Sequence, residues 1–422
     1  MRIQDGSIVE LGVDLSLQSG EESIDCEGKW LLPGLVDCHV HFREPGLVRK
    51  EGYAYGSKGA LHGGVTTVCE IQNNPPLMAS DSLLRKKLED LKGISHVDYA
   101  PYGSLVEDSL AHLSLMKDLC PAVKCFLGCS TGAGGVPDRA TLKRWFAAAA
   151  SAGVKVVAHC EDNKVMNAAT EELKDKPELF SRHDLRRSVA AEVESIKEAI
   201  EVAIEVGCVL HVFHISTAEG GKLVLEAASQ GHPITGTTAP HYLLVNAEEA
   251  HAINENRFKV NPSIKYVEDL EGLAEIISSR QLAGIGTDHA PHPLDEKQRP
   301  YSKSPSGFPS VDILLPLVVE SARFHKKEME SFLYAVTAAP AEEFNLSCKG
   351  CLAPGFDADL VIADPDSNFV VDEKTLPSRS KWSPYHGRKL SAKPEKVFLR
   401  GNLVFDQGSV LGDAIGKPLF YE

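Results

Sequence analysis

Short apolar runs alternate with longer amphipathic stretches through the middle of the chain. Eight apolar runs span residues 35–40, 65–69, 97–100, 122–126, 154–158, 209–213, 234–237 and 282–286. Stretches with helical periodicity, such as 140–152 and 187–206, lie between them. Strands separated by helices predict a parallel sheet, and eight such units predict a closed (β/α)8 barrel. An open doubly wound sheet is the alternative, but no Gly-x-Gly-x-x-Gly follows the first run.

The two ends of the chain follow a different pattern. Ile3 and Ile8 flank the turn pair Asp5-Gly6, which predicts a β-hairpin. Near the C-terminus, short apolar strands at 359–362, 396–399 and 402–405 are separated by turn residues. We therefore expect an α/β fold in which a (β/α)8 TIM barrel over residues 34–349 carries a small β-sandwich domain. Both termini would build that domain, from residues 1–33 and 350–422.

Composition narrows the class of protein. The 422 residues are 43% hydrophobic and 24% charged, which is ordinary for a globular chain and excludes disorder as the main state. No run approaches the roughly 18 apolar residues of a membrane helix, and no apolar signal core follows Met1, so we expect a cytoplasmic protein. Its ten cysteines are then expected to be reduced thiols. The net charge of −15 argues against nucleic acid as a partner, because nucleic-acid binding needs basic stripes.

Candidate metal ligands stand where the apolar runs end. His39 and His41 follow the alternation of a strand and therefore point to the same side. His159, His214 and Asp288 end the fifth, sixth and eighth runs. Each residue alone would more often be a satisfied polar side chain than a ligand. Together they predict a metal site, because the carboxyl ends of barrel strands meet at one face, and imidazole with carboxylate suits zinc or a similar ion.

Lys124 lies within the fourth apolar run. A lysine in a barrel mouth beside cations is disfavoured as an ammonium ion. One interpretation is a side chain that reaches solvent or pairs with an acid. The other is that its neutral amine captures carbon dioxide as a carbamate, which bridges two metal ions that share one hydroxide.

A family resemblance rests on motifs spread over nearly the whole chain. They are DCHVHFREPG at 37–46, VKCF at 123–126, AHCE at 158–161, HVFHIS at 211–216, VNP at 260–262, GTDHAPH at 286–292 and GFDADL at 355–360. In this order the set resembles the dihydroorotases of the amidohydrolase superfamily. Each motif alone is found more widely in that superfamily.

The resemblance implies a site with two zinc ions. His39, His41 and Asp288 would bind the more buried ion. His159 and His214 would bind the second, and carbamylated Lys124 would bridge the two. Asp288 would also act as general base, taking the proton from the bridging hydroxide and delivering it to the departing ring nitrogen.

Four further residues match substrate-binding positions of the family. Arg43 lies two residues beyond His41, where a guanidinium can clamp a ring carboxylate in bidentate fashion. Asn73 and His292 would add contacts, and Asn261 would face the amide edge of the ring. The alternatives are that Arg43 pairs with Glu44 or Glu51 and that Asn73 caps a turn beside Pro75.

The resemblance implies the reversible closure of N-carbamoyl-L-aspartate to L-dihydroorotate, a step of pyrimidine biosynthesis. Another cyclic amidase, such as an allantoinase or a hydantoinase, is the alternative enzyme. A third interpretation is an inactive scaffold for a transcarbamoylase, although such a protein is expected to have lost metal ligands. We expect a homo-oligomer that binds a small-molecule substrate, and the sequence leaves open whether it also associates with a transcarbamoylase.

Overall fold

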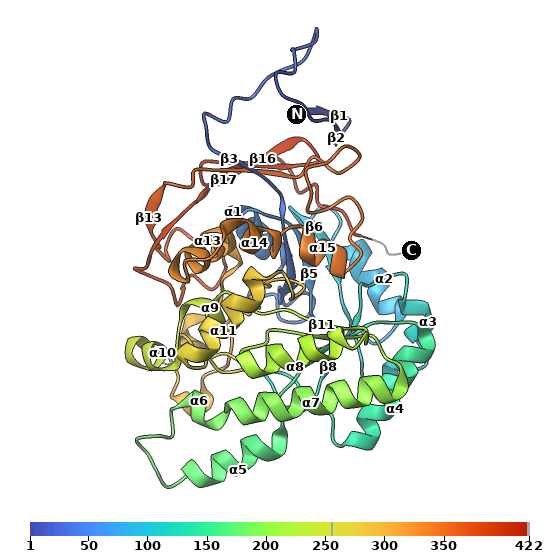
Figure 1. Cartoon of the computed structure of the whole chain (residues 1–422), viewed down its shortest axis with the longest axis vertical. Coiled ribbons are helices and arrows are strands. Elements are labelled where there is room, and N and C mark those ends of the chain that lie inside the picture. The colour runs from blue at the N-terminus through green and yellow to red at the C-terminus, as the bar shows by residue number, and fades with distance from the viewer. Residues whose placement is uncertain (255, 420–422) are drawn as a thin grey trace.

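The alternating middle of the chain folds into a barrel of parallel strands (Figure 1). In the computed structural model, which describes residues 1–254 and 256–419, the strands pair in the orders β4-β5-β6 and β7-β8-β9-β10-β11. The amide of Tyr102 donates to the Glu70 carbonyl and joins the two groups. The strands are β4 (Leu35–Val40), β5 (Val65–Glu70), β6 (Asp98–Pro101), β7 (Gly103–Ser104), β8 (Val123–Phe126), β9 (Val156–His159), β10 (Leu210–Val212) and β11 (Ile234–Gly236).

The eighth apolar run closes the ring, but it is not a regular strand. Two isolated parallel bridges, Thr238 to Ile285 and Val40 to His289, connect it to its neighbours on either side. Asp288 has a positive φ of 50°, which is incompatible with extended backbone and interrupts the hydrogen-bond ladder. The prediction that residues 282–286 occupy the eighth barrel position is confirmed. The prediction that they form a regular strand is wrong.

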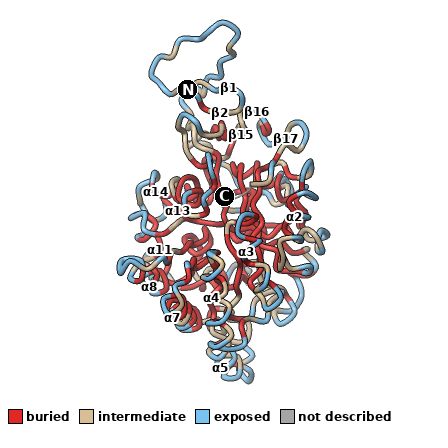
Figure 2. The backbone as a smooth tube through the Cα atoms, turned by 90° about the vertical axis from the view of Figure 1, so that its right-hand side faces the viewer, coloured by how far each residue is buried: buried red, intermediate tan, exposed pale blue. Residues whose placement is uncertain are grey.

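Helices cover the outside of the barrel, and Figure 2 shows buried residues concentrated inside it. The predicted helices at 140–152 and 187–206 are confirmed as α4 (Arg139–Ala152) and α7 (Val189–Val206). Both begin at a capping side chain, Asp138 or Ser188, and end at a left-handed glycine. The other helices are α1 (Tyr53–His62), α2 (Asp81–Asp90), α3 (Leu113–Met116), α5 (Asn163–Leu173), α6 (His183–Arg186), α8 (Ala218–Ser229), α9 (His241–Leu244), α10 (Ala247–Asn254), α11 (Val267–Ser278), α12 (Leu294–Lys297), α13 (Leu314–Phe324), α14 (Met329–Tyr334) and α15 (Ala338–Glu343), with 3-10 turns η1 (Glu107–Ser109), η2 (Tyr301–Lys303) and η3 (Val311–Ile313).

Strands from both ends of the chain form one sheet beside the barrel, at the top of Figure 1. The sheet order is β17 (Ser409–Val410), β16 (Asn402–Asp406), β15 (Pro394–Leu399), β12 (Leu360–Ala363) and β3 (Trp30–Pro33). The predicted hairpin is β1 (Arg2–Gln4) with β2 (Ser7–Glu10), and its Ile8 is buried with Leu360, Ile362 and Phe398. The fold class is the predicted one, a barrel with a small β-sandwich domain.

Part of the C-terminal segment lies against the barrel. The indole of Trp382 donates to the His292 carbonyl at 2.7 Å, and the amide of Tyr99 donates to the Lys417 carbonyl. A further two-stranded sheet pairs β13 (Asn368–Val370) with β14 (Lys389–Ser391). The domain limits at residues 33 and 350 stay a prediction, and residues 420–422 lie outside the described part of the chain. No helix in the described part has the length and apolarity needed to span a membrane.

Candidate active site

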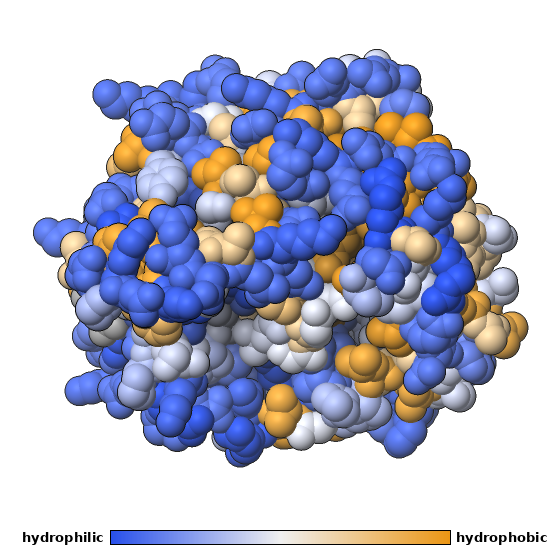
Figure 3. Space-filling view, turned by 90° about the horizontal axis from the view of Figure 1, so that it is seen from below, coloured by the Kyte–Doolittle hydropathy of each residue, from blue (hydrophilic) through white to orange (hydrophobic). Residues whose placement is uncertain are grey.

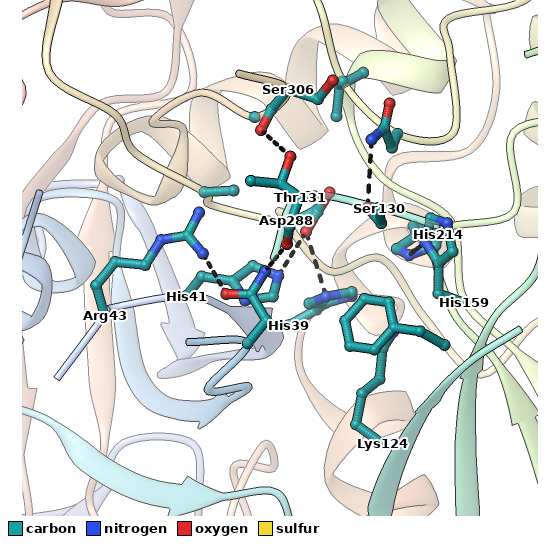
Figure 4. A pocket seen from close by; sticks show the side chains of 16 residues that line it. His39, His41, Arg43, Lys124, Ser130, Thr131, His159, His214, Asp288 and Ser306 are labelled. Carbon is teal, nitrogen blue, oxygen red and sulfur yellow. Dashed lines mark hydrogen bonds and ion pairs between the residues drawn. The ribbon is translucent and has the colours of Figure 1, made fainter. Parts of the chain in front are cut away.

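Most of the predicted site residues meet in one pocket at the carboxyl ends of the barrel strands (Figure 4). Among its lining residues are His39, His41, Arg43, Asn73, Lys124, His159, His214, Asn261 and Asp288. These residues come from segments far apart in the sequence, and the barrel topology brings the ends of those segments together.

His39, His41 and Asp288 form the first ligand group. Asp288 Oδ1 lies 3.3 Å from His39 Nε2 and 3.1 Å from His41 Nε2. The Nδ1 of His41 donates to the Ile71 carbonyl at 2.8 Å, which leaves the lone pair of Nε2 turned toward the pocket. The ligating atoms of the three residues lie within 4.8 Å of one another, so a single ion can bind all three.

His159 and His214 form the second group. His159 Nδ1 lies 3.0 Å from His214 Nε2, while His159 Nε2 donates to Glu161 Oε2 at 2.9 Å. Glu161 is fully buried and also accepts a hydrogen bond from Arg187. Burial alone would raise the pKa of Glu161, but Arg187 and His159 outweigh it and lower that pKa to about 2. The charged carboxylate therefore fixes the His159 tautomer that offers Nδ1 to a metal ion.

The amine of Lys124 is buried between aromatic rings. Its Nζ lies 4.7 Å from the centre of the Phe213 ring and 4.9 Å from that of Phe126. The side chain is only 3% exposed, and Nζ has no hydrogen-bond partner among the described residues. Burial lowers the pKa of Lys124 to about 7. The arrangement fits neither a lysine that reaches solvent nor one paired with an acid, whereas a neutral amine is the form that reacts with carbon dioxide.

The backbone is strained at three positions of the pocket. Arg43, His214 and Asp288 have φ values of 66°, 42° and 50°. Left-handed conformations of this kind are uncommon outside glycine and cluster at functional sites. Asp37 anchors one of these turns, because its carboxylate accepts hydrogen bonds from the Thr287 amide at 3.0 Å and hydroxyl at 2.5 Å.

Arg43 and Asn73 form a polar pair at one side of the pocket. The Arg43 guanidinium donates to Asn73 Oδ1, and Asn73 Nδ2 donates to the Thr131 carbonyl at 2.9 Å. Arg43 is buried, and among the described residues no carboxylate forms an ion pair with it. Glu44 instead accepts from the Tyr53 amide, and Glu51 accepts from the Ser378 hydroxyl. The positive charge is therefore available to a ligand.

Asn261 lies in the pocket wall, but His292 does not. Asn261 accepts a hydrogen bond from His183 Nε2 at 2.9 Å, and its Nδ2 lies 3.3 Å from Ser130 Oγ. His292 Nε2 donates to the Ser306 carbonyl at 3.1 Å, and its Nδ1 accepts from Lys50. The structure thus places His292 behind the backbone of Ser306, and it is absent from the described lining residues.

Several residues of the site were not predicted. Phe126, Ser130 and Thr131 line the pocket, and Thr131 donates to the Ser306 carbonyl at 3.1 Å. The available signal was that Phe126 ends β8 and that Ser130 and Thr131 follow it, ahead of the glycine-rich residues 132–135. For Glu161 the signal was its place two residues beyond His159.

Comparisons with known proteins identify the family of this chain. Residues 30–404 match the model of the Amidohydrolase family. The chain is 33% identical to an allantoinase of Rubrobacter xylanophilus, over 98% of this chain and 92% of that protein. It is 30% identical to a dihydroorotase of Listeria welshimeri, over 96% and 94% of the two chains. An L-hydantoinase (dihydropyrimidinase) from Arthrobacter aurescens superposes with a TM-score of 0.93 at 26% identity, covering 100% of this chain and 95% of the other. The chain belongs to the amidohydrolase family.

Proposed function

We propose that this hydrolase of cyclic amides is a dihydroorotase, which interconverts N-carbamoyl-L-aspartate and L-dihydroorotate. The observation that carries the proposal is the buried Arg43 guanidinium, which faces the pocket without an ion-pair partner in the described part of the chain. A buried cation without an ion-pair partner is costly, and a carboxylate on the substrate would pair with it through bidentate hydrogen bonds. Dihydroorotate carries such a carboxylate on its ring.

The donor set suits two zinc ions. His39, His41 and Asp288 would hold one ion, His159 and His214 the other, and Lys124 would lie between them as a carbamate. Such a carbamate forms when the neutral amine adds to carbon dioxide and loses a proton. When bound, the ions supply Lewis acidity toward the amide oxygen and lower the pKa of water.

Side chains of the pocket would transfer the proton and bind the substrate. In ring opening, Asp288 takes the proton of the attacking water and delivers it to the departing ring nitrogen, and closure runs in reverse. Arg43 and Asn73 hold the ring carboxylate, and Asn261 faces the amide edge. His292 would act through the Ser306 carbonyl that it holds, as a positioning residue.

An allantoinase or a hydantoinase is the second candidate. The identities to the allantoinase and the dihydroorotase above are nearly equal, so overall similarity does not separate the two activities. Allantoin and hydantoin carry no ring carboxylate, and neither would compensate Arg43. An inactive scaffold is disfavoured because six intact candidate ligands face one pocket. Association with a transcarbamoylase or with further copies of the chain stays a prediction.

Parallel rate measurements on the zinc-loaded protein test the proposal. Dihydroorotate, allantoin, hydantoin and dihydrouracil would each be assayed at equal enzyme and substrate concentration. We expect the highest kcat/KM for dihydroorotate. A higher value for allantoin or hydantoin would reverse the assignment while leaving the amidohydrolase chemistry intact.

A further inference from the structure

A second cavity lies beside the reaction pocket. It encloses about 360 Å³ and shares the lining residue Ser306 with that pocket. Its walls include Cys129, Phe180, His183, Arg186, Lys259 and Tyr301, and we call the cavity lined by these residues the antechamber. Helices α5 and α6 contribute to it at the lower end of Figure 1, and the surface seen from below in Figure 3 is largely hydrophilic.

Arg186 is the distinctive residue of the antechamber. Its guanidinium carbon lies 4.7 Å from the centre of the Phe180 ring and 5.5 Å from that of Tyr301. One nitrogen donates to Thr170 Oγ1 at 3.3 Å. Within the described chain no carboxylate forms an ion pair with Arg186, whereas its neighbour Arg187 pairs with Glu161. The two aromatic rings orient the Arg186 guanidinium, and its positive charge can then bind an anionic ligand.

The residues that line the antechamber carry positive charge, although the whole chain is acidic. Its described lining residues include arginine, lysine and histidine and no aspartate or glutamate. Lys259 is held in place by the carbonyls of Tyr301 and Ser304, at 2.7 and 2.6 Å. Because the whole chain has a net charge of −15, an anion is repelled at long range and attracted only locally.

The walls of the antechamber are also walls of the reaction pocket. His183 accepts a hydrogen bond from the Tyr301 hydroxyl at 2.6 Å and donates from its other nitrogen to Asn261, which lines the reaction pocket. Ser306 lines both spaces. A molecule held by Arg186 therefore lies next to the site where the reaction is expected.

We propose that the antechamber is an anion-binding site in which Arg186 receives the carboxylate-bearing substrate before it passes Ser306 into the reaction pocket. The proposal rests on the proposed function, because it requires an anionic substrate. Arg186 would offset the repulsion from the acidic surface, and Arg43 would then bind the ring carboxylate at the reaction site. A planar guanidinium suits this task because it binds a carboxylate with two parallel hydrogen bonds.

The first test measures the potential of the antechamber without any substrate. Cys129 is exposed in its wall, and Cys348 is an exposed cysteine outside it. The full-length protein would be treated with a sulfonate-bearing and a trimethylammonium-bearing methanethiosulfonate, and each cysteine's labelling rate would be read by mass spectrometry.

We expect Arg186→Gln to lower the anionic-to-cationic rate ratio at Cys129 by about fivefold at low salt, as loss of one nearby charge implies. The ratio at Cys348 should hold, and Arg186→Lys should keep the wild-type ratio at Cys129. An unchanged ratio at Cys129 in Arg186→Gln would overturn the proposal.

The second test measures substrate capture. We expect Arg186→Gln to lower kcat/KM for dihydroorotate by about fivefold or more at low salt, through KM more than kcat, with most of the loss disappearing at high salt. Lys389→Gln removes the same charge from the exposed strand β14 and should leave kcat/KM unchanged. Equal effects of the two variants, or a loss independent of salt, would refute capture by Arg186. Absence of dihydroorotate turnover in the wild type would instead refute the proposed function. The cysteine-labelling result does not depend on turnover and would still test the anion-binding site.

Discussion

Replacing Glu161 by glutamine tests how the second histidine pair is held. In the wild type, His159 Nε2 donates to the buried carboxylate at 2.9 Å, so Nδ1 carries the lone pair that faces His214. A glutamine amide can donate to Nε2 as well, and His159 could then carry its proton on Nδ1, where no metal ion binds. Loss of such an outer partner weakens metal binding by about 10–100-fold, or about 1.4–2.8 kcal/mol.

The assay is a chelator competition on zinc-loaded protein, with zinc per chain as the readout. We expect Glu161→Gln to lower the zinc affinity of the site formed by His159 and His214 by about 10–100-fold. The zinc affinity of the site formed by His39, His41 and Asp288 should not change. Glu343→Gln is a matched control. Glu343 also shares its carboxylate between a histidine and a cation, His211 and Lys155, but none of these lines the reaction pocket.

The outcome separates a positioning role from a merely structural one. Wild-type zinc affinity in Glu161→Gln would refute the reasoning that this carboxylate sets the His159 tautomer. Equal zinc loss in the Glu343 control would show that any buried histidine–carboxylate pair has the same effect, and it would refute the reasoning too.

Three further outcomes are expected. Lys124→Ala should lose activity that short carboxylic acids partly restore in rate assays, because an added carboxylate can replace the carbamate; full activity without added acid would contradict the bridge. Asp288→Asn should lower kcat by about 10²–10⁴-fold with little change in thermal unfolding, and a near-normal kcat would remove it as the base. Burial raises the pKa of Glu51 from 4.5 to about 8 although Ser378 donates to it. Between these values the folded chain keeps a proton that the unfolded chain releases, so the free energy of unfolding should fall as pH rises, by up to about 5 kcal/mol. Urea unfolding should show a smaller decline for Glu51→Gln, because the buried Asp37 and Glu192 also have raised pKa values, and identical pH profiles for variant and wild type would contradict the buried acid.

Much of the barrel was predictable because its pattern is local. Apolar runs of strand length and amphipathic stretches of helical length each fix their own element, and the barrel then brings all strand ends to one face. His39, Lys124 and His159 could be placed at the pocket for this reason alone. The irregular closing segment was not predictable, because the positive φ of Asp288 follows Thr287, which is hydrogen-bonded to Asp37 on a strand about 250 positions away.

Contacts between segments far apart in the chain could not be predicted from the sequence. His292 lies four residues beyond Asp288, but the backbone turns at Asp288 and directs His292 behind Ser306. The link from Glu161 to Arg187 joins the end of β9 to the start of α7, and no periodicity relates the two. The antechamber depends on the same kind of contact, since Arg186 and Tyr301 meet only in the folded chain.

Carboxylate recognition is tested most directly by one ratio, kcat/KM for dihydroorotate divided by kcat/KM for dihydrouracil, measured in the wild type and in Arg43→Gln. Dihydrouracil has the same ring without the carboxylate. We predict that the substitution lowers this ratio by about tenfold or more, as loss of a charge-assisted hydrogen bond implies. An unchanged ratio, with both substrates affected alike, would contradict a site built around an anionic ring substituent.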